Sequence, residues 1–245
     1  MSKLLNEILK MPVPKSVAII MDGNRRFARR LMKKPWEGHK IGVMKARDVF
    51  KWACEIGIKY ITIYTLSIEN LKSRPKMELR QIFKYFDNEM DVLLSGDHII
   101  HKTKTRVRFI GRIKVLPKKL QQKMKKIEHL TERYKDHFLN MAVAYGGRQE
   151  IIDACKKIAK KTSKGIIKPG QINENLIKKN LYASDFPYPD LIIRTGGERR
   201  ISNFLLWQSA YSELAFTNKK WPEMDKNTFL RIIRDYQKRE RRFGK

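Results

Sequence analysis

Cysteine is scarce in this sequence, with only Cys54 and Cys155 among 245 residues. Both lie within helix-like apolar patterns, which are typical of small buried side chains. There is no CxxC pair and no Cys/His cluster, so the sequence offers no zinc site. The low cysteine count and the lack of a signal-peptide pattern favour a cytoplasmic location.

Long apolar runs are also missing. No stretch is long enough to span a bilayer, so any membrane contact is expected to be peripheral. No internal repeat or Gly/Ser-rich linker divides the chain, and 42% of the residues are hydrophobic. We therefore expect one domain over residues 1–245, with an N-terminal helix or arm over residues 1–15. The apolar pattern of Leu4–Leu9 would suit a helix that lies on a membrane or one that packs on the body.

Acidic residues are few: 25 Asp and Glu stand against 54 Lys and Arg, which gives a formal net charge of +29. So basic a chain favours nucleic acid, phosphorylated small molecules or an anionic membrane surface as partners. No RNP, helix-turn-helix or zinc pattern accompanies the charge, which argues against nucleic acid. The lysine-rich segments Lys102–Lys126 and Lys156–Lys168 are either solvated helix faces or surfaces for anionic lipid head groups.

Short apolar, β-branched runs predict six strands, separated mostly by stretches of helical period. The strand runs are Val17–Met21, Tyr60–Leu66, Val107–Ile110, Phe138–Ala144, Leu191–Ile193 and Glu213–Phe216. Two of the helical stretches are Val43–Ile56 and Met77–Leu94. Strand alternating with helix indicates an α/β fold whose parallel sheet is covered on both faces.

Polar residues follow the first predicted strand, where Asp22-Gly23-Asn24-Arg25-Arg26 leads into an Arg-rich helical segment. Parallel sheets bind ligands at the carboxyl ends of their strands. A helix N-terminus and two arginines suit a diphosphate. A carboxylate beside phosphates would repel them unless a bridging Mg²⁺ removed the conflict. The alternative is a plain Asp-Gly turn with solvated arginines.

Three other strand ends carry polar or Gly/Arg loops. They are Ser67-Ile68-Glu69-Asn70, Tyr145-Gly146-Gly147-Arg148 and the stretch from Arg194 to Asn203. The last combines a Gly pair, three arginines and hydroxyls, which is typical of a phosphate-binding nest. No GxxxxGK[ST] loop is present and no GxGxxG follows the first strand, so P-loop and dinucleotide-binding folds are disfavoured.

At these residues the sequence resembles the cis-prenyltransferase family, which includes undecaprenyl and dehydrodolichyl diphosphate synthases. The match runs nearly end to end. Its anchors are MDGNRRFA at Met21–Ala28, GHK at Gly38–Lys40, YTLSIEN at Tyr64–Asn70, AYGGR at Ala144–Arg148, DLIIRTGGERRISNFLLWQ at Asp190–Gln208, SELAF at Ser212–Phe216 and RERRFG at Arg239–Gly244. The aspartate-rich DDxxD pattern of trans-type prenyl synthases is missing.

The resemblance implies a single Rossmann-like domain whose central, mostly parallel six-stranded sheet is flanked by helices. It implies a homodimeric, Mg²⁺-dependent enzyme that condenses isopentenyl diphosphate with an allylic prenyl diphosphate. The product would be a long polycis-polyprenyl diphosphate, the precursor of a glycosyl carrier lipid. The helix Met77–Leu94 would line an apolar tunnel for the growing chain, and at about 1.5 Å per residue it spans roughly 27 Å.

The resemblance also implies residue roles. Asp22 and Glu213 would bind Mg²⁺, and Asp22, Arg26 and Asn70 would act in catalysis, with Asn70 as proton acceptor. The residues implied to bind substrate are Gly23, Asn24, Arg25, Arg26, Phe27, His39, Ser67, Ile68, Glu69, Leu71, Arg74, Arg194, Arg200, Ile201, Ser202, Arg242 and Gly244.

These substrate-binding residues fall into two groups. The resemblance assigns the segment from Gly23 to Arg26 to the allylic diphosphate, and Arg194, Arg200 and Ser202 to the isopentenyl diphosphate. It further implies that the C-terminal tail, residues 239–245, places Arg242 and Gly244 at the isopentenyl site of the partner subunit.

Three departures from the family pattern bear on substrate and metal. Leu71 stands where many members have an aromatic residue, and the loop to Arg74 is one residue longer. Arg199 stands where bacterial members commonly have a histidine, and arginine cannot ligate Mg²⁺. The DGNRR form is closer to eukaryotic and archaeal-type members, which hints at a primer other than the bacterial one, such as geranylgeranyl diphosphate; the choice between farnesyl and geranylgeranyl diphosphate stays open. Product length stays open, and a non-catalytic partner subunit is the alternative, although such subunits usually lack this Asp and Arg.

Overall fold

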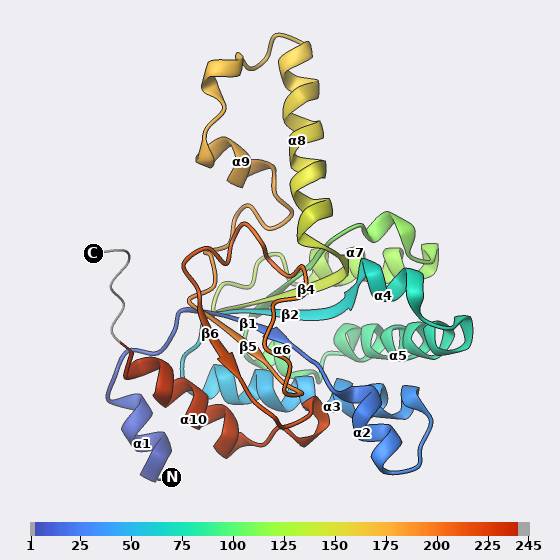
Figure 1. The fold of residues 1–245 in the computed structure, drawn as a ribbon, viewed down its shortest axis with the longest axis vertical. Coiled ribbons are helices and arrows are strands. Elements are labelled where there is room, and N and C mark those ends of the chain that lie inside the picture. Colours follow the sequence, from blue (N-terminus) through green and yellow to red (C-terminus); the bar gives the residue numbers. More distant parts are fainter. Residues whose placement is uncertain (1–2, 240–245) are drawn as a thin grey trace.

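Six parallel strands form the centre of the structure (Figure 1), a computed structural model that describes residues 3–239. The strands are β1 (Ser16–Ile20), β2 (Tyr60–Ser67), β3 (Thr105–Ile110), β4 (His137–Tyr145), β5 (Leu191–Arg194) and β6 (Glu213–Phe216). They lie in the order β3-β4-β2-β1-β5-β6, and every pairing is parallel. All six predicted strands are confirmed, with bounds that differ by no more than two residues.

Ten α-helices lie within the described residues. They are α1 (Lys3–Leu9), α2 (Asn24–Arg30), α3 (Pro35–Glu55), α4 (Ile68–Ser73), α5 (Lys76–Leu94), α6 (Ile99–Lys102), α7 (Lys118–Leu130), α8 (Gly147–Ser163), α9 (Glu174–Asn180) and α10 (Lys226–Gln237). The predicted helical stretches Val43–Ile56 and Met77–Leu94 correspond to α3 and α5, and the predicted Arg-rich helical segment corresponds to α2. Helix α3 begins eight residues before the predicted start because Pro35, a residue favoured in the first helical turn, opens it.

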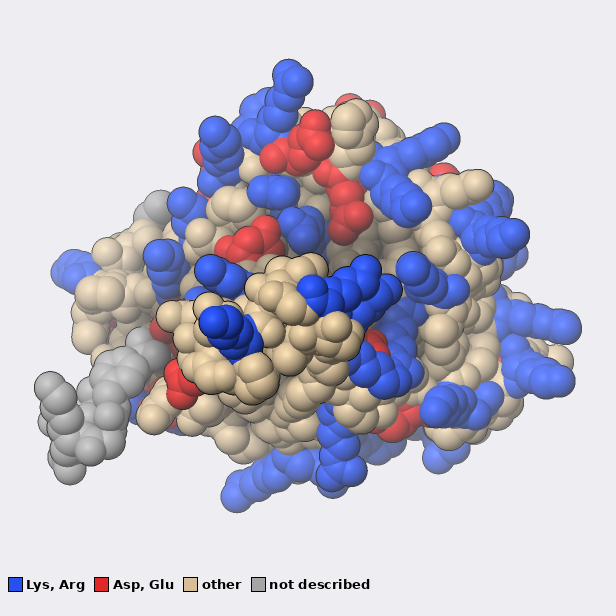
Figure 2. Space-filling view, turned by 90° about the horizontal axis from the view of Figure 1, so that it is seen from above, with Lys and Arg blue, Asp and Glu red and all other residues tan. Residues whose placement is uncertain are grey.

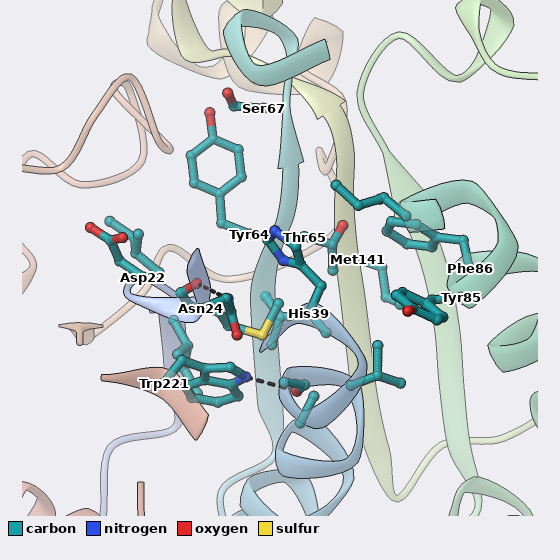
Figure 3. Close-up of a pocket in the computed structure, with 18 of the residues that line it drawn as sticks. Asp22, Asn24, His39, Tyr64, Thr65, Ser67, Tyr85, Phe86, Met141 and Trp221 are labelled. Atoms are coloured by element: carbon teal, nitrogen blue, oxygen red, sulfur yellow. Dashed lines mark hydrogen bonds between the residues drawn. The ribbon is translucent and has the colours of Figure 1, made fainter. Parts of the chain in front are cut away.

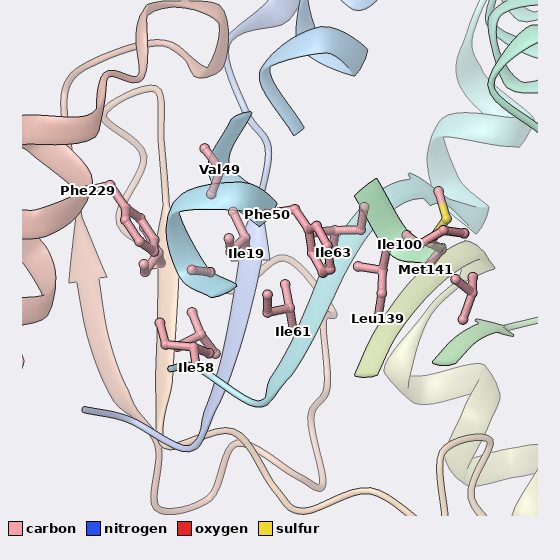
Figure 4. Packing of buried hydrophobic residues seen from close by; sticks show 14 of the residues in the cluster. Ile19, Val49, Phe50, Ile58, Ile61, Ile63, Ile100, Leu139, Met141 and Phe229 are labelled. Atoms are coloured by element: carbon pink, nitrogen blue, oxygen red, sulfur yellow. The ribbon is translucent and has the colours of Figure 1, made fainter. Parts of the chain in front are cut away.

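Side chains alternate between the two faces of the sheet, as the pleat of a strand requires. On β1, Val17 and Ile19 point to one face, and Ala18 and Ile20 point to the other. The first face packs against α1, α3, α5, α7 and α10 to form the main core (Figure 4). Burial of one large aliphatic or aromatic side chain there contributes about 1.5–3 kcal/mol, so this face holds most of the apolar stabilisation.

The second face of the sheet carries a smaller core. This core includes Tyr64, Tyr145 and Phe204, and the rings of Tyr64 and Phe204 stack with their centroids 4.4 Å apart. Helix α8 extends away from the body together with α9 instead of lying along the sheet (Figure 1). The segment after β5 covers part of this face through Phe204 and Leu205, and the predicted α/β fold with a helix-flanked parallel sheet is confirmed.

The N-terminal helix packs on the protein body. Leu5 and Ile8 are buried, α1 contacts α10, and Gln237 Nε2 donates to Ile8 O at 3.0 Å. Cys54 is half-buried but Cys155 is exposed on α8, so the predicted burial is wrong for Cys155. Between residues 3 and 239, no helix has both the length and the apolar character needed to cross a membrane.

Lysine and arginine side chains are spread over much of the face shown in Figure 2, with few acidic groups among them. Part of this charge is neutralised within the fold. Lys123 of α7 lies 2.7 Å from Asp87 and 2.6 Å from Asp91, both on α5. A role of the two lysine-rich segments in lipid contact stays a prediction.

Two glycines let α3 lie directly against the loop after β1. A Cβ on Gly38 would lie 2.0 Å from Asn24 O, and one on Gly42 would lie 2.4 Å from Asn24 Oδ1. No carbon atom fits at such distances. Asn24 Nδ2 donates in turn to Met21 O at 2.9 Å, so the packing of α3 fixes the position of this loop.

We expect Gly38→Ala to lower the free energy of unfolding by about 1–3 kcal/mol, the usual cost of overpacking, because backbone has to move to admit the methyl group. Gly96→Ala is the matched control, since nothing lies within 4 Å of its added Cβ. Urea unfolding followed by circular dichroism compares the two variants. Equal midpoints would contradict the close approach of α3 to Asn24.

Candidate active site

The carboxyl ends of three neighbouring strands meet at one edge of the sheet. β1 pairs with β2 on one side and with β5 on the other. Asp22 follows β1, Ser67 ends β2 and Arg194 ends β5. The loop after β4 joins them, because Gly147 N–H donates to Asn203 O at 2.7 Å. All four predicted strand-end loops therefore contribute to one region, as expected of a parallel sheet.

The carboxylate of Asp22 is held by donors on both oxygens. Its Oδ2 accepts from Arg194 Nη2 at 2.8 Å, and its Oδ1 accepts from Gly23 N–H at 2.6 Å. Arg26 Nη2 lies 3.3 Å from Oδ1. The side chain is 30% exposed, so its orientation is fixed while it remains open to a ligand.

The backbone around Asp22 is fixed as well. Its N–H donates to Thr195 Oγ1 at 3.0 Å, and its carbonyl accepts from the Thr195 hydroxyl at 2.8 Å and from Trp221 N–H at 2.9 Å. Gly23 has a φ of 100° at the N-cap of α2, in the left-handed region that favours glycine. Sequence reasoning identified the Asp-Gly turn but did not identify Thr195 or Trp221 as its supports.

Arg194 connects Asp22 to the loop after β5. Its side chain is only 6% exposed, and its Nη1 donates to Ser202 Oγ at 2.6 Å and to Arg200 O. Its Nε has no hydrogen-bond partner among the described residues. The structure therefore brings the predicted Mg²⁺ ligand Asp22 together with Arg194 and Ser202, which were assigned to isopentenyl diphosphate.

Glu198 joins two of the predicted arginines at the rim. Its Oε1 accepts from Arg26 Nη1 at 3.2 Å, and its Oε2 accepts from Arg200 Nη1 at 2.6 Å. Both arginines are exposed. Sequence reasoning missed Glu198, although a lone carboxylate within the run GGERR could have suggested an internal counter-charge.

Glu78 of α5 is a buried carboxylate that the sequence reasoning also missed. Its Oε1 lies 3.3 Å from Arg74 Nη1, 3.6 Å from Arg25 Nε and 3.4 Å from His39 Nε2. Contact with His39 and the two guanidinium groups holds the pKa of Glu78 below its usual range. One carboxylate thus gathers three predicted site residues, which come from α2, α3 and the turn between α4 and α5.

His39 is neutral at pH 7. Burial lowers its pKa from the ordinary value of 6.5, and the charges of Arg74 and Arg25 act in the same direction against the opposing effect of Glu78. Its Nε2 lies 3.0 Å from Arg74 Nη1. In the tautomer with its proton on Nδ1, Nε2 of His39 accepts from Arg74 Nη1. In the other tautomer, the Nε2–H group donates to Glu78 Oε1.

The loop after β2 is built around an N-cap. Ser67 Oγ accepts from Asn70 N–H at 3.0 Å at the start of α4, which positions the Asn70 side chain. Glu69 Oε1 accepts from Asn203 Nδ2 at 2.6 Å. Asn203, with a left-handed φ of 61°, links three loops, and it was quoted in the motif without a role.

A cavity of about 640 Å³ opens between these loops and runs between the sheet, α3 and α5. Figure 3 shows Asp22 and Asn24 on one side of it and Tyr85 and Phe86 across from them. Its polar lining includes Asp22, Asn24, Arg25, His39, Ser67, Glu69, Asn70, Arg74, Arg194 and Ser202. Its deeper lining is largely apolar and includes Val43, Val49, Phe50, Ile61, Ile63, Ile82, Phe86, Leu93, Leu139 and Met141.

Several predicted residues lie outside the cavity lining. Phe27 is half-buried beneath the guanidinium of Arg30, whose central carbon is 5.7 Å from the ring centroid. Leu71 packs against the main core and Ile201 against the smaller one. Ile68 is buried at the start of α4. Gly23, Arg26 and Arg200 support the rim and do not line the cavity.

Glu213 does not meet Asp22 within this chain. It begins β6 at the opposite edge of the sheet, in register with the first residue of β5, and its Oε2 accepts from Arg239 Nη1 at 2.7 Å. Glu213 is level with Val17 of β1, which precedes Asp22 by five residues, or roughly 16 Å along the strand direction. Arg242 and Gly244 lie outside the described residues.

Comparison with known proteins places this geometry in a family. The family model described as "Putative undecaprenyl diphosphate synthase" matches residues 20–244. A relative in Methanopyrus kandleri, a geranylgeranyl-diphosphate-specific tritrans,polycis-undecaprenyl-diphosphate synthase, is 52% identical over 95% of this chain and 85% of its own. The protein of the same name in Methanocaldococcus jannaschii is 50% identical over 99% and 87%.

Solved structures agree. Lavandulyl diphosphate synthase from Lavandula x intermedia, crystallised with dimethylallyl diphosphate, superposes with a TM-score of 0.89 at 34% identity, covering 98% of this chain and all of its own. A probable undecaprenyl diphosphate synthase from Campylobacter jejuni gives a TM-score of 0.77 at 33% identity, covering 96% and 100%. The chain therefore belongs to the cis-prenyltransferase family and is a prenyltransferase.

Proposed function

We propose that this protein condenses isopentenyl diphosphate with an allylic prenyl diphosphate and repeats the step to build a long polycis-polyprenyl diphosphate. The observation that carries the proposal is the meeting of Asp22 with Arg25, Arg74 and Arg194 at the polar end of an otherwise largely apolar cavity. Such a site suits a ligand with an anionic head and a hydrocarbon tail. The product would be of the undecaprenyl class, the precursor of a glycosyl carrier lipid.

Geranylgeranyl diphosphate is the proposed primer. The archaeal relatives carry this specificity in their names. The cavity supports a long apolar primer, because its deeper lining is largely apolar and its volume is about 640 Å³.

The proposed reaction uses the charges of the site. The double bond of isopentenyl diphosphate attacks the allylic carbon, the allylic C–O bond breaks, and a proton leaves to form the new cis double bond. Arg25 and Arg74 would stabilise the charge that builds on the departing diphosphate. Arg194 with Ser202 would bind isopentenyl diphosphate, and Asn70 is the proposed proton acceptor. The apolar wall would keep water away from the reacting allylic carbon.

The proposal includes Mg²⁺ bound by Asp22. Within residues 3–239 there is no group of three or more His, Cys, Asp or Glu side chains arranged to hold a metal. Mg²⁺ needs no such group, because one or two carboxylates and the substrate phosphates suffice. Asp22 fits this requirement, since it lines the cavity among arginines that attract phosphates. When bound, the ion would neutralise charge on the leaving diphosphate.

A homodimer forms part of the proposal. Because Glu213 lies at the far edge of the sheet from Asp22, it can join an Asp22 site only from a second copy of the chain. The tail residues Arg242 and Gly244 are proposed to act across the same interface. Peripheral contact with an anionic membrane also stays a prediction.

Product analysis tests the proposed function. With Mg²⁺ and labelled isopentenyl diphosphate, we expect the protein to extend geranylgeranyl diphosphate more efficiently than farnesyl diphosphate, with products sized by chromatography. We expect Asp22→Asn to reduce turnover at least about a hundredfold, the scale for removing one preorganised electrostatic group. Asp48→Asn, at an exposed carboxylate on α3, is the control. Wild-type-like turnover in Asp22→Asn would sink the assignment.

Metal removal provides a second check. We expect EDTA to abolish product formation and added Mg²⁺ to restore it, because the diphosphate leaves poorly without the ion's charge. The circular dichroism spectrum should not change, since the fold is held by the apolar core and the sheet. Product formation that survives EDTA would rule out the Mg²⁺ part of the proposal.

The Glu78 cluster predicts a pH-dependent stability. Glu78→Gln leaves Arg25 and Arg74 without their shared carboxylate, and we expect a loss of roughly 3 kcal/mol in the free energy of unfolding at pH 7. The pKa of Glu78 is lowered in the fold, so its contribution is complete above the ordinary value of 4.5 and is lost as the pH falls further. Urea unfolding at pH 7 and pH 4 should show the difference from wild type shrinking at pH 4. A constant difference would contradict this account.

A further inference from the structure

The turn between α2 and α3 exposes apolar side chains to solvent. Leu31 is 45% exposed and Met32 is 97% exposed, and both belong to the run Leu31-Met32-Lys33-Lys34 that joins the two helices. Met77, near the start of α5, is 63% exposed. Single apolar side chains on a surface are ordinary, so exposure by itself assigns no role to this turn.

The backbone of the turn distinguishes Met32 from an ordinary surface residue. Helix α2 ends in a Schellman motif, in which Lys33 N–H donates to Ala28 O at 2.9 Å and Met32 N–H donates to Arg29 O at 3.0 Å. Met32 occupies the position of this motif that glycine usually takes, and its φ of 52° lies in the left-handed region. A Cβ atom is disfavoured in that conformation. The fold therefore keeps an exposed apolar side chain where glycine would fit with less strain.

Positive charge surrounds these apolar side chains. Residues 29–40 and 72–80, which we call the mouth patch, contain two acidic residues, Glu37 and the buried Glu78. Among the described residues, Arg30 alone of the exposed cations in the patch forms an ion pair, with Glu223. The other exposed cations are Arg29, Lys33, Lys34, Lys40, Lys72, Lys76 and Arg80. The patch therefore presents cations that no acidic side chain neutralises.

The mouth patch lies beside the opening of the cavity. α2 follows β1 and α4 follows β2, so the α2–α3 turn and the α4–α5 turn lie beyond the carboxyl ends of these strands, on one side of the molecule (Figure 1). Glu78 connects the two segments, since it lies 3.6 Å from Arg25 of α2 and 3.4 Å from His39 of α3. Helix α2 has seven residues and is about 10 Å long, so the α2–α3 turn projects beyond the charged lining of the cavity.

The combination of groups in the patch is typical of a segment that binds at a membrane surface. Such segments insert apolar side chains at the boundary of the acyl chains and place cations on anionic head groups. Trp36 follows the lysine pair, with Lys34 Nζ 5.4 Å from its ring centroid, and indole rings are enriched at this boundary. A nucleic acid would use the cations but would leave Leu31 and Met32 in water. The apolar side chains therefore favour a lipid partner.

We propose that the mouth patch docks the protein on an anionic membrane, with Leu31 and Met32 inserted at the boundary between head groups and acyl chains. Neither signal suffices alone, because stable membrane attachment takes an apolar anchor together with several cations. The purpose of the docking rests on the proposed function. A prenyl primer and its longer product carry hydrocarbon that water excludes, and docking holds the cavity mouth at the lipid that dissolves such chains.

Vesicle sedimentation in the absence of substrate tests the docking. We expect wild-type protein to sediment with vesicles of phosphatidylglycerol and phosphatidylcholine in equal amounts and to stay in solution with phosphatidylcholine alone. Met32→Gly should lower the partition coefficient about fivefold or more, because it removes the inserted side chain. Lys33→Gln should lower it about fivefold, which corresponds to about 1 kcal/mol for one lysine near an anionic surface.

The choice of glycine at position 32 separates docking from folding. Glycine relieves the left-handed conformation, so urea unfolding of Met32→Gly should show no loss of stability while vesicle binding falls. Ile166→Ala is the matched control, because Ile166 is 67% exposed within the second lysine-rich segment, beyond α8. Its binding should equal that of wild-type protein.

The other outcomes would overturn the docking. Wild-type protein that does not bind the anionic vesicles would do so directly. Binding that depends on Lys33 but not on Met32 would be binding of charge alone, without insertion. Binding that both variants leave unchanged, and that Lys118→Gln with Lys125→Gln abolishes, would place the lipid surface on α7. Because no turnover is needed, protein that binds vesicles but extends no primer would overturn the proposed function and leave the docking intact.

Discussion

The ion pair between Asp22 and Arg194, two residues that are 172 positions apart in the sequence, joins the ends of the neighbouring strands β1 and β5. Removing two charges from water is costly unless their remaining hydrogen bonds are made. Here Gly23 N–H donates to the Asp22 carboxylate. Ser202 Oγ and the Arg200 carbonyl accept from Nη1 of the Arg194 guanidinium. The loop after β5 is thereby tied to the site, and the same loop carries Phe204 over the second face of the sheet. The polar site and the smaller core thus depend on one contact.

Much of the fold is predictable because local chemistry decides it. β-branched runs form strands wherever the sheet is buried, and polar loops at parallel strand ends must share an edge. The groups that sequence reasoning missed are of another kind. Glu78, Glu198 and Thr195 each have a partner remote in the sequence that no local pattern reveals. These partners are His39, Arg26 and Asp22, respectively. Glu213 is the opposite case. Its sequence motif is clear, but within one chain the residue does not lie beside Asp22.

Helix α5 shows why an apolar stripe does not identify its partner. The predicted stripe of large residues on this helix divides in the structure. Ile82, Phe86 and Leu93 line the cavity, whereas Met90 is fully buried in the main core and Phe83 packs against that core. α5 contacts both α3 and α7, so its buried surface is wider than one stripe. Periodicity reports that a face is covered, but only the tertiary arrangement decides whether protein or a cavity covers it.

Helix α3 has a mechanical consequence for the cavity. It carries His39 beside the Glu78 cluster near one end and Arg47 at the deep wall, so both ends of the cavity lie on one stiff rod. Because Gly38 and Gly42 have no side chains, α3 lies directly against Asn24 after β1. This contact gives the helix a pivot close to its N-terminus. A tilt about this pivot would be small at the charged mouth and larger further along α3, where burial of Val49, Phe50 and Ala53 in the main core opposes it. The deep wall of the cavity is therefore held by side-chain packing, and the charged mouth is held by the close contact of two glycines with Asn24.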